Sequence, residues 1–468
     1  VPFKKVNQPY PVAKYPNYVK LGYGNFSSPL LELGVFQTLG SFSTSSKISY
    51  ERFGNGPVNG SNSGSSTGLI DISATHKKEN WQITPSISYT SQKYRFYGNT
   101  DRINTGFRSE EADEAVWSDF SLSLSYSGKT EGAKYSITPI FNTSIQKLTD
   151  DVSINKETTL GIDGNLSFEI DEHFSTGLNL QGLSGDFDGG LTYDRSLFNA
   201  NPSVTYLNDE VKIQAGFNVA SSKSGETNTS GFYPDISGKW SFSRDWAVYG
   251  SLSGGVNWNG LNDILGQNAF LDDSLAILNT ETKLEFGGGI KGVLFKNMIL
   301  DANVMISNLD QLPIFIPSLS DSSRYTLTYD GGTIDRFRLN ASLTYTPTNV
   351  STYGATLELN SYSMESLERP WHLPSYVFKA FTSHNINEKL ITSITFLSMG
   401  GLKAPANVSF GIAALDSFLD ANIGLKYLIT KRASAFVDVN NILGNEYERY
   451  LGYPVRGLSF KIGGQYRF

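Results

Sequence analysis

The chain has 468 residues, no cysteine, a formal net charge of −7 and a mean hydropathy of −0.24. The lack of cysteine excludes disulfides and thiol chemistry, and the acidic balance argues against a nucleic-acid binder. With 45 Gly, 25 Tyr and 29 Phe against 4 Met, the composition favours strands and turns over helices. No run approaches the roughly 18 apolar residues of a membrane-spanning helix.

The chain opens with a segment unlike the rest. Residues 1–16, VPFKKVNQPYPVAKYP, are rich in Pro and Lys and predict an extended N-terminal segment ahead of the first strand. From residue 17 onward, apolar and polar residues alternate along almost the whole chain, with no break in composition and no linker. Examples are 120–126, 337–345, 353–360 and 419–429.

Alternation over ten or more residues predicts a strand with one apolar face and one wet face. Soluble strands average about half that length, whereas a strand that crosses a membrane needs about 9–11 residues. The length of these runs therefore favours membrane-spanning strands.

The connections between the strands also alternate in length. Short polar turns are predicted at Gly40 and at 78–80, 129–131, 171–172, 208–209, 244–245, 296–297, 348–349, 387–388 and 430–431. Longer segments rich in Gly, Asn, Ser and Asp lie between them, among them 54–68, 99–114, 259–280 and 400–416. Short turns at one end and long loops at the other are typical of outer-membrane barrels, whose long loops face the outside.

The predicted fold class is therefore all-β, a transmembrane antiparallel β-barrel of about 22 strands and 11 outer loops that occupies residues 17–468. A soluble propeller is the alternative, but it requires a repeat of about 40–50 residues and buries both strand faces. Aromatic residues near strand ends predict girdles at the membrane interfaces; they lie at 94–97 and at Trp246, Tyr362, Trp371 and Tyr376.

Patterns that carry chemistry are sparse. The histidines lie far apart, on different predicted strands or strand ends, and lack the close spacing of a metal cluster; they are His76, His173, His372 and His384. The stretch GGGIKG at 287–292 matches G-x-G-x-x-G, but it lies inside an alternating run with no helix after it, so we interpret it as wall glycines.

Acidic clusters in predicted outer loops offer carboxylates for a hard cation such as Ca²⁺, although solvated loop charge is the favoured interpretation. The clusters are Glu110, Glu111, Asp113 and Glu114; Asp150 and Asp151; Asp186 and Asp188; and Asp272 and Asp273. Lumen-facing charges such as Arg338, Glu358, Asp420 and Lys426 are likewise interpreted as solvated wall residues. We expect no metal site, no cofactor, no catalytic residues and no enzymatic activity.

The last strand carries the clearest signal. One face is apolar and runs to the final residue, and the other carries Ser, Lys, Gln and Arg. We expect this strand to close the barrel against the first strand, near 18–24, with its apolar face in lipid and its end at the periplasmic interface. The residues assigned to barrel closure and to the insertion signal are Leu458, Phe460, Ile462, Tyr466 and Phe468.

The stretch AFVDVNNILGNEYERYLGYPVRGLSFKIGGQYRF at 435–468 resembles the end of a TonB-dependent receptor barrel. Such barrels typically close with an Asn-Leu-Phe-Asn-x-x-Tyr-like phrase, a loop containing Gly-x-Pro-x-Arg and a last strand ending in Arg-Phe. Residues 439–445, Tyr447, 452–456 and 467–468 occupy those places. Residues 17–35 resemble TonB-receptor-like outer-membrane proteins of the Bacteroidota type.

The resemblance implies a location in the outer membrane of a Gram-negative cell, with both termini periplasmic. It also exposes a departure, because the family carries an N-terminal plug domain and a short TonB box. With a first strand near residue 17, we expect neither of them within these residues. A lumen of about 22 strands must nevertheless be filled, by inward-folded outer loops, by residues 1–16, by a plug or by a partner.

Two functions follow. The first is a non-enzymatic subunit or scaffold, lacking its own plug, of an outer-membrane complex for protein insertion, secretion or surface export. The alternative is the barrel of a TonB-dependent importer for a nutrient or metal chelate, with its plug outside this sequence. A passive porin ranks lowest, because ordinary porins have about 16–18 strands.

The expected partners follow from the same two functions. They are outer-membrane lipid and lipopolysaccharide, together with other envelope proteins. The envelope proteins are either subunits of a complex or TonB and a surface lipoprotein. No nucleic acid is expected as a partner.

Overall fold

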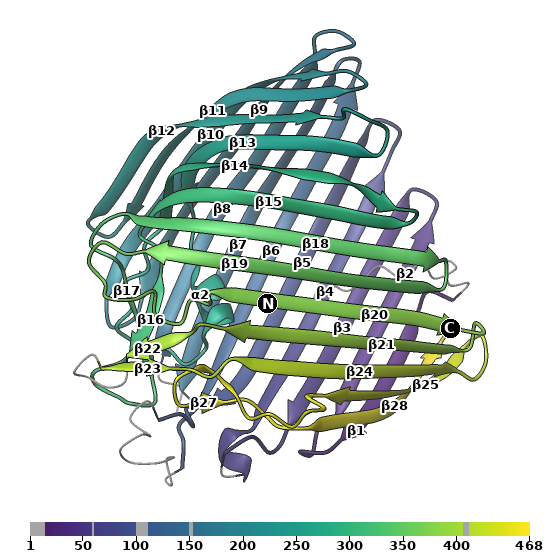
Figure 1. Cartoon of the computed structure of the whole chain (residues 1–468), viewed down its shortest axis with the longest axis vertical. Helices are drawn as coiled ribbons and strands as arrows, with labels where there is room; N and C mark the ends of the chain where they lie inside the picture. Colours follow the sequence, from purple (N-terminus) through teal and green to yellow (C-terminus); the bar gives the residue numbers. More distant parts are fainter. Residues whose placement is uncertain (1–14, 59, 100–110, 149–152, 406–410) are drawn as a thin grey trace.

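The computed structural model describes residues 15–58, 60–99, 111–148, 153–405 and 411–468. Its main feature is one closed antiparallel sheet of 22 strands, drawn as a tilted barrel in Figure 1. The helical elements in the described ranges are η1 (Gly60–Ser63) and α2 (Leu261–Gln267). None of the helices described is long and apolar enough to cross a membrane.

The barrel wall consists of consecutive antiparallel hairpins. Its strands are β1 (Tyr18–Gly24), β2 (Leu30–Leu39), β3 (Phe42–Phe53), β4 (Ser65–Lys77), β5 (Trp81–Arg95), β6 (Glu114–Thr130), β7 (Ala133–Leu148), β8 (Ser153–Glu169), β9 (Phe174–Asp188), β10 (Thr192–Leu207), β11 (Val211–Ser224), β12 (Thr227–Trp240), β13 (Trp246–Asn257), β14 (Thr280–Phe295), β15 (Met298–Asp310), β18 (Ile334–Thr348), β19 (Ser351–Ser363), β20 (Tyr376–Ile386), β21 (Leu390–Gly400), β24 (Phe418–Leu428), β25 (Ala433–Asn440) and β28 (Ser459–Arg467). Three small hairpins lie in the loops: β16 (Ile314–Pro317) with β17 (Tyr325–Thr328), β22 (Lys403–Pro405) with β23 (Ile412–Ala414), and β26 (Glu448–Tyr450) with β27 (Tyr453–Pro454).

The alternation in the sequence becomes the two faces of this wall. Along β6, Leu122 and Leu124 are 43% and 42% exposed on the outside, whereas Asp119 on the opposite face is 9% exposed. The same outward apolar face recurs on strands all around the barrel. An apolar outer surface is favourable in a bilayer, and a closed sheet leaves no backbone group unpaired there. The structure thus confirms the predicted all-β transmembrane antiparallel barrel.

The ten predicted short turns all lie at one end of the barrel, which we call the inner end. Several of them use left-handed backbone, as at Gly40 with φ of 61° and Asn297 with φ of 66°, where Gly and Asn are the tolerated residues. The start of β1 meets the last residue there as well, since Phe468 N–H donates to the Asn17 carbonyl at 3.0 Å. The long loops lie at the opposite, outer end (Figure 1).

The strands reach further into two of the predicted loops than expected. The predicted loop at 54–68 ends at residue 64, because Ser65 already pairs with Phe53 in the β3–β4 ladder. The predicted loop at 400–416 includes the hairpin of β22 and β23. Both differences arise because backbone N–H and C=O groups find partners that local composition does not reveal.

The β1–β28 seam, defined as the pairing of the first strand with the last, closes the barrel. Its register runs from Tyr18 opposite Arg467 to Gly24 opposite Lys461. The five residues assigned to closure and insertion lie on the outer face and are 39–55% exposed: Leu458, Phe460, Ile462, Tyr466 and Phe468. Their role as an insertion signal stays a prediction. The predicted N-terminal segment 1–16 lies almost wholly outside the described residues.

The predicted aromatic girdles are only partly correct. Trp246 lies at the inner end of β13, on the same outward face as the exposed Val248. Tyr94, Phe96 and Trp371, by contrast, are 3%, 0% and 2% exposed and lie inside the outer end of the barrel. Closeness to a strand end can be inferred from the sequence, but the face that a terminal side chain takes depends on what packs against it.

We expect Ile462→Asp to impair assembly of the barrel in the outer membrane, because it places a carboxylate on the lipid face of the β1–β28 seam. Deletion of Phe468 is expected to slow insertion while leaving the ladder intact. Assembly of both variants is measured by the heat-modifiable migration of the folded barrel in membrane fractions. Leu319→Asp is the matched control, since Leu319 is 74% exposed in a loop outside the wall. Normal assembly of Ile462→Asp would contradict the orientation of β28.

Candidate functional site

Long outer loops fold inward and build an apolar cluster inside the outer end of the barrel, which we call the mouth core. It joins the ends of β5, β6, β8 and β9 to the loops that follow β13, β15 and β25. Its buried members are Tyr94, Phe96, Ala115, Trp117, Ile154, Phe187, Leu261, Ile264, Leu265, Leu271, Leu275, Ile277, Phe315, Tyr325, Tyr450 and Tyr453. The loops therefore cover part of the lumen at this end.

The largest contribution comes from the loop between β13 and β14, residues 258–279, which we call the α2 loop. Its helix turns Leu261, Ile264 and Leu265 into the mouth core, where each is at most 1% exposed. Asp263 Oδ2 accepts the Gly260 N–H at 3.2 Å and so caps the start of the helix. Burying each such aliphatic side chain contributes about 1.5–3 kcal/mol of favourable free energy, and this burial stabilises the inward position of the loop.

A buried ion pair fastens the α2 loop to the wall. Arg195 on β10 pairs with Glu157 on β8, and their side chains are 0% and 3% exposed. Glu157 Oε2 accepts the Leu261 N–H at 2.6 Å, and Arg195 Nη2 donates to the Asn259 carbonyl at 2.9 Å and to Asn279 Oδ1 at 2.7 Å. Both charges thus also bond to the loop, which offsets the desolvation that a buried pair costs.

Two buried amides hold the other half of the α2 loop. Gln146 Nε2 donates to Tyr94 Oη at 2.7 Å and to the Leu271 carbonyl at 3.3 Å. Asn155 Nδ2 donates to Gln146 Oε1 and to the Asp272 carbonyl, both at 2.7 Å. These wall side chains satisfy loop carbonyls that would otherwise be buried without a partner.

Tyrosine hydroxyls link one loop to the next across the mouth. Tyr325 Oη donates to the Leu451 carbonyl at 2.7 Å, and Tyr450 Oη donates to the Gln267 carbonyl at 3.0 Å. These bonds join three loops that are far apart in sequence. Burial raises the pKa of both hydroxyls, so they remain protonated donors at any physiological pH.

His372 is the titratable group at the centre of these loops. Its Nδ1 donates to the Phe315 carbonyl at 2.9 Å, and its ring lies 5.4 Å from the ring of Tyr325 and 5.2 Å from that of Tyr450, centroid to centroid. Burial lowers the pKa of His372 to about 4, so the ring is neutral at neutral pH. It therefore acts as a structural bridge between loops.

Below the mouth core, the inner wall is polar. A recess of about 400 Å³ is lined by carboxamides and one carboxylate from β8 to β11, among them Asp163, Asn165, Asn179, Gln181, Asn199 and Asn201. A second recess of about 350 Å³ lies at the β1–β28 seam, with Lys20, Glu32, Glu51, Asp438 and Lys461 on its walls. Such a surface can hydrogen-bond water, a polar domain seated in the lumen, or a polar solute passing through it.

The histidines lie apart in the structure. His76 stacks on Phe42, with ring centroids 4.1 Å apart, at the inner end, and His384 contacts Tyr353 within the wall. His173 lies in an inner turn. Across the described ranges, no three His, Cys, Asp or Glu side chains converge as a metal site would require.

Some members of the acidic clusters are held by protein groups, whereas Asp186, Asp188 and Asp273 are exposed. Glu114 pairs with Lys93 and Arg95, and Asp113 pairs with Arg324 at 3.3 Å. Asp272, expected to be solvated, is 3% exposed and lies within the α2 loop. Its position follows from the inward fold of that loop, which local charge does not reveal. Three members lie outside the described residues: Glu110, Asp150 and Asp151.

The remaining candidates keep their structural interpretation. Residues 287–292 lie within β14, and a Cβ at Gly287 would come within 2.1 Å of the Val304 carbonyl oxygen, so the close approach of β15 requires glycine there. The lumen charges were expected to be solvated, but Asp420 and Lys426 bond to neighbouring protein groups: Tyr447 Oη donates to Asp420 at 2.9 Å, and Lys426 Nζ donates to Gln465 at 2.5 Å.

Sequence reasoning missed the residues that anchor the α2 loop. Alternation alone could have placed Gln146, Asn155, Glu157 and Arg195 on the inner face near the outer strand ends, where a carboxylate and a guanidinium on neighbouring hairpins suggest a pair. Most partners in the loop carry no such signal, because they bond through backbone atoms; Asn279, which accepts through its side-chain oxygen, is the exception.

Comparison with protein-family models and with curated proteins finds no match. Comparison with solved structures finds the FrpB iron transporter from Neisseria meningitidis, with a TM-score of 0.75 and 12% identity over 97% of this chain and 81% of that one. The ferric-catecholate import receptor Fiu from E. coli K12 has a TM-score of 0.73 and 11% identity over 98% and 82%. The ferric yersiniabactin uptake receptor FyuA from Yersinia pestis has a TM-score of 0.73 and 13% identity over 98% and 81%.

These solved structures are TonB-dependent receptor barrels, and the likeness confirms, at the level of the fold, the resemblance drawn from 435–468. Sequence identities this low support a shared fold, but they do not indicate a shared ligand. The chain therefore shares the closed 22-strand barrel fold of these receptors.

We expect Glu157→Ala to loosen the α2 loop, because it leaves the Arg195 guanidinium buried without its carboxylate, at a cost of about 3–5 kcal/mol. The measurement is hydrogen exchange of residues 258–279, which should speed up while the wall strands stay protected. Lys134→Ala is the matched control. It breaks the exposed Lys134–Glu169 pair, 2.8 Å long, at the inner end, where water screens both charges and little effect is expected. Equal exchange in both variants would contradict the anchoring role.

We expect the loop contacts around His372 to weaken as the pH falls. The pKa of His372 is about 4 in the folded protein and 6.5 ordinarily. The neutral ring therefore contributes stability fully above about pH 6.5, and that stability is lost progressively as the pH falls towards about 4. Hydrogen exchange of residues 441–458, corrected for intrinsic rates, should report the loss. His372→Gln should remove the pH dependence, and an unchanged dependence in this variant would contradict the assignment.

Proposed function

We propose that this chain is the barrel of an outer-membrane importer for a metal chelate of the ferric-siderophore class. The observation that carries the proposal is a closed 22-strand wall, with its own loops folded over the outer mouth, that is similar along 97–98% of its length to ferric-chelate receptors. This is the alternative that the sequence left open, and the comparisons favour it over the scaffold subunit.

The physical argument begins with the size of the barrel. A lumen of 22 strands would leak solutes if left open, so the outer end must be covered until a ligand arrives. The mouth core supplies such a cover from the chain's own loops.

The lumen itself needs a second element. We propose that the polar recesses of the inner wall receive a lumen-filling domain, carried either by the same polypeptide or by a partner, whose rearrangement admits the chelate. Accumulation against a gradient across the outer membrane requires coupling to an envelope protein of the TonB type. The importer would have both termini on the periplasmic side, an extended N-terminal segment at 1–16 and the barrel at 17–468, with lipopolysaccharide around its outer leaflet and no enzymatic activity.

We expect a strain that lacks the gene to lose most of its energy-dependent uptake of iron from at least one chelate among a ferric catecholate, ferric yersiniabactin and ferric pyoverdine. The measurement is accumulation of radioactive iron, with and without an uncoupler. The wild-type gene should restore uptake, whereas the gene for Ile462→Asp, which is expected not to assemble, is the matched control.

Two outcomes would contradict the importer. Unchanged uptake of all three chelates, together with stoichiometric envelope proteins that co-purify with the barrel, would favour the scaffold subunit. Uptake that persists with the uncoupler and saturates with no chelate would favour a porin.

A further inference from the structure

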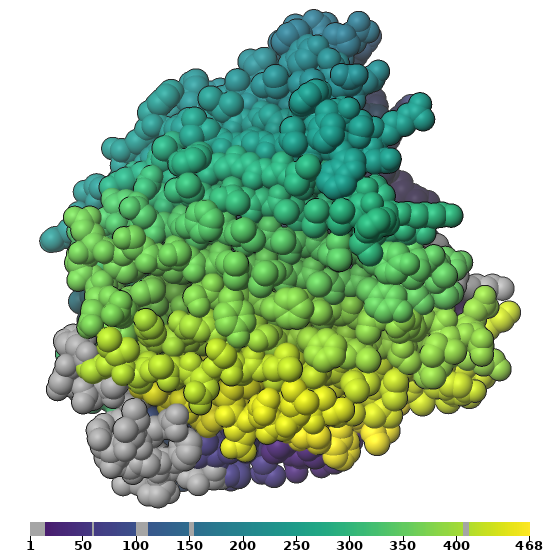
Figure 2. Space-filling view, viewed as in Figure 1, coloured from purple at the N-terminus to yellow at the C-terminus, as the bar shows by residue number. Residues whose placement is uncertain are grey.

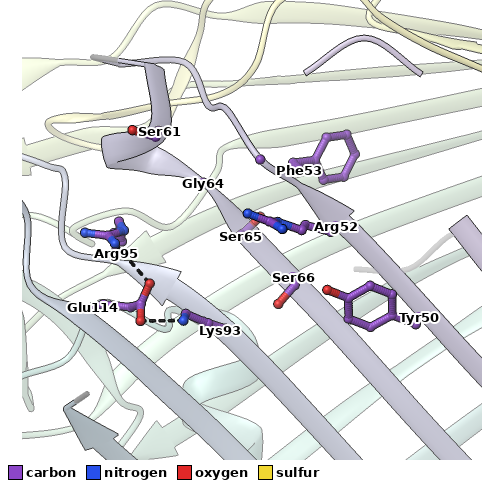
Figure 3. A pocket seen from close by; sticks show the side chains of 11 residues that line it. Tyr50, Arg52, Phe53, Ser61, Gly64, Ser65, Ser66, Lys93, Arg95 and Glu114 are labelled. Atoms are coloured by element: carbon purple, nitrogen blue, oxygen red, sulfur yellow. Dashed lines mark ion pairs between the residues drawn. The ribbon is translucent and has the colours of Figure 1, made fainter. Parts of the chain in front are cut away.

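A cationic recess lies on the outer surface of the wall, near the outer ends of β3, β4, β5 and β6. It has a volume of about 290 Å³, and Figure 3 shows Tyr50 and Arg52 on one side of Ser66 and Lys93, Arg95 and Glu114 on the other. We call it the rim recess, and its key members are Tyr50, Arg52, Ser66, Lys93, Arg95 and Glu114. It is separate from the mouth core, which lies inside the barrel.

The alternation along the strands places the rim recess on the outside. On β3, Tyr50 is 41% exposed, while its neighbour Glu51 faces inward and pairs with Lys461. On β5, Lys93 and Arg95 flank Tyr94, which is buried in the mouth core. Because successive strand residues point to opposite faces, the cations of the rim recess point away from the lumen.

The register gives the height of the rim recess in the membrane. Paired residues on the outer face form rows across β3, β4 and β5. The outermost row is charged and consists of Arg52, Ser66 and Lys93, and the next consists of Tyr50, Gly68 and Ser91. The two apolar rows that follow are Ile48, Ile70 and Tyr89, and then Ser46, Ile72 and Ile87. Neighbouring rows are about 7 Å apart along the strand. The charged row thus lies about 14 Å from the first apolar row along the strand, or about 10 Å along the membrane normal at a tilt of about 45°, which places it at the outer edge of the headgroup layer.

The charges in the rim recess are not balanced. Lys93 and Arg95 share the carboxylate of Glu114, at 2.5 Å and 3.1 Å, and Arg95 also pairs with Glu111 at 3.4 Å, so two carboxylates face three cations. The side chain of Arg52 is exposed and makes no ion pair or hydrogen bond with any residue in the described ranges. Since Gly68 has no side chain and Ser66 a short one, the space beside Arg52 stays open. A cation at this height, with open space beside it, suits an anionic headgroup.

We propose that the rim recess binds a phosphate group of a diphosphoryl glycolipid in the outer leaflet. Arg52 and Lys93 would contact the phosphate, with the hydroxyls of Tyr50 and Ser66 as further hydrogen-bond partners. The acyl chains would then lie along the apolar rows that begin at Ile48. A bound lipid would fix the depth and rotation of this side of the barrel. The proposal depends on the outer-membrane location and not on the importer role.

The test is native mass spectrometry of the full purified chain in detergent micelles that contain diphosphoryl lipid A. The wild-type protein should retain one lipid A molecule, and the double variant Arg52→Gln/Lys93→Gln should bind it about 10- to 30-fold more weakly. The matched control is Lys296→Gln/Lys431→Gln. It removes the same charge from two exposed inner turns and should bind as the wild type does.

Each outcome decides the proposal. Equal loss in both double variants, or no loss in either, would overturn the assignment of lipid binding to the rim recess. Displacement of lipid A by millimolar inorganic pyrophosphate would show a site for free anions and would overturn the glycolipid. Retention of lipid A in the presence of pyrophosphate, with weaker binding of a dephosphorylated lipid A, would support it. Heat-modifiable migration confirms that every variant is folded, and the uptake assay reports separately on the importer.

Discussion

The rest of the structure depends on one constraint, which is that no backbone N–H or C=O group can remain unpaired in hydrocarbon. The β1–β28 seam meets it by joining the first strand to the last, with Tyr18 opposite Arg467. Because the sheet closes, its strands need only alternate, and one face can be wholly apolar while the other stays polar. The size of the lumen then follows from the number of strands. The outer loops fold into this lumen and fill its outer end.

The loops that fill the outer end form a second core there, the mouth core. A loop that enters this space brings polar backbone groups with it, and these groups must find partners in the wall. Gln146, Asn155 and the Arg195–Glu157 pair supply them, while the apolar side chains of the α2 loop supply the favourable burial. The wall and the loop thus stabilise each other. In the importer that we propose, this arrangement would keep the mouth covered until a ligand arrives.

The sequence predicted the barrel far better than it predicted the mouth. The strand number, the inner turns and the outward faces follow from local patterns, as at Leu122 and Leu124, where alternation decides the face. At strand ends, alternation no longer predicts the environment of a side chain. Tyr94 and Trp371 were expected at the membrane interface, yet they lie inside the barrel because loops from elsewhere in the chain pack on them. Asp272 was expected in solvent and is buried for the same reason.

What the sequence determined by itself was the membrane barrel and its orientation of faces, because period-two alternation and turn chemistry act over a few residues. What only the tertiary structure decided was which loops fill the outer end and which buried groups hold them. Arg195 lies 38 residues from Glu157 and 84 residues from Asn279, and these groups meet only through the strand register and the closure of the sheet. A pattern that spans two residues cannot encode contacts over such distances, whereas a closed wall imposes them.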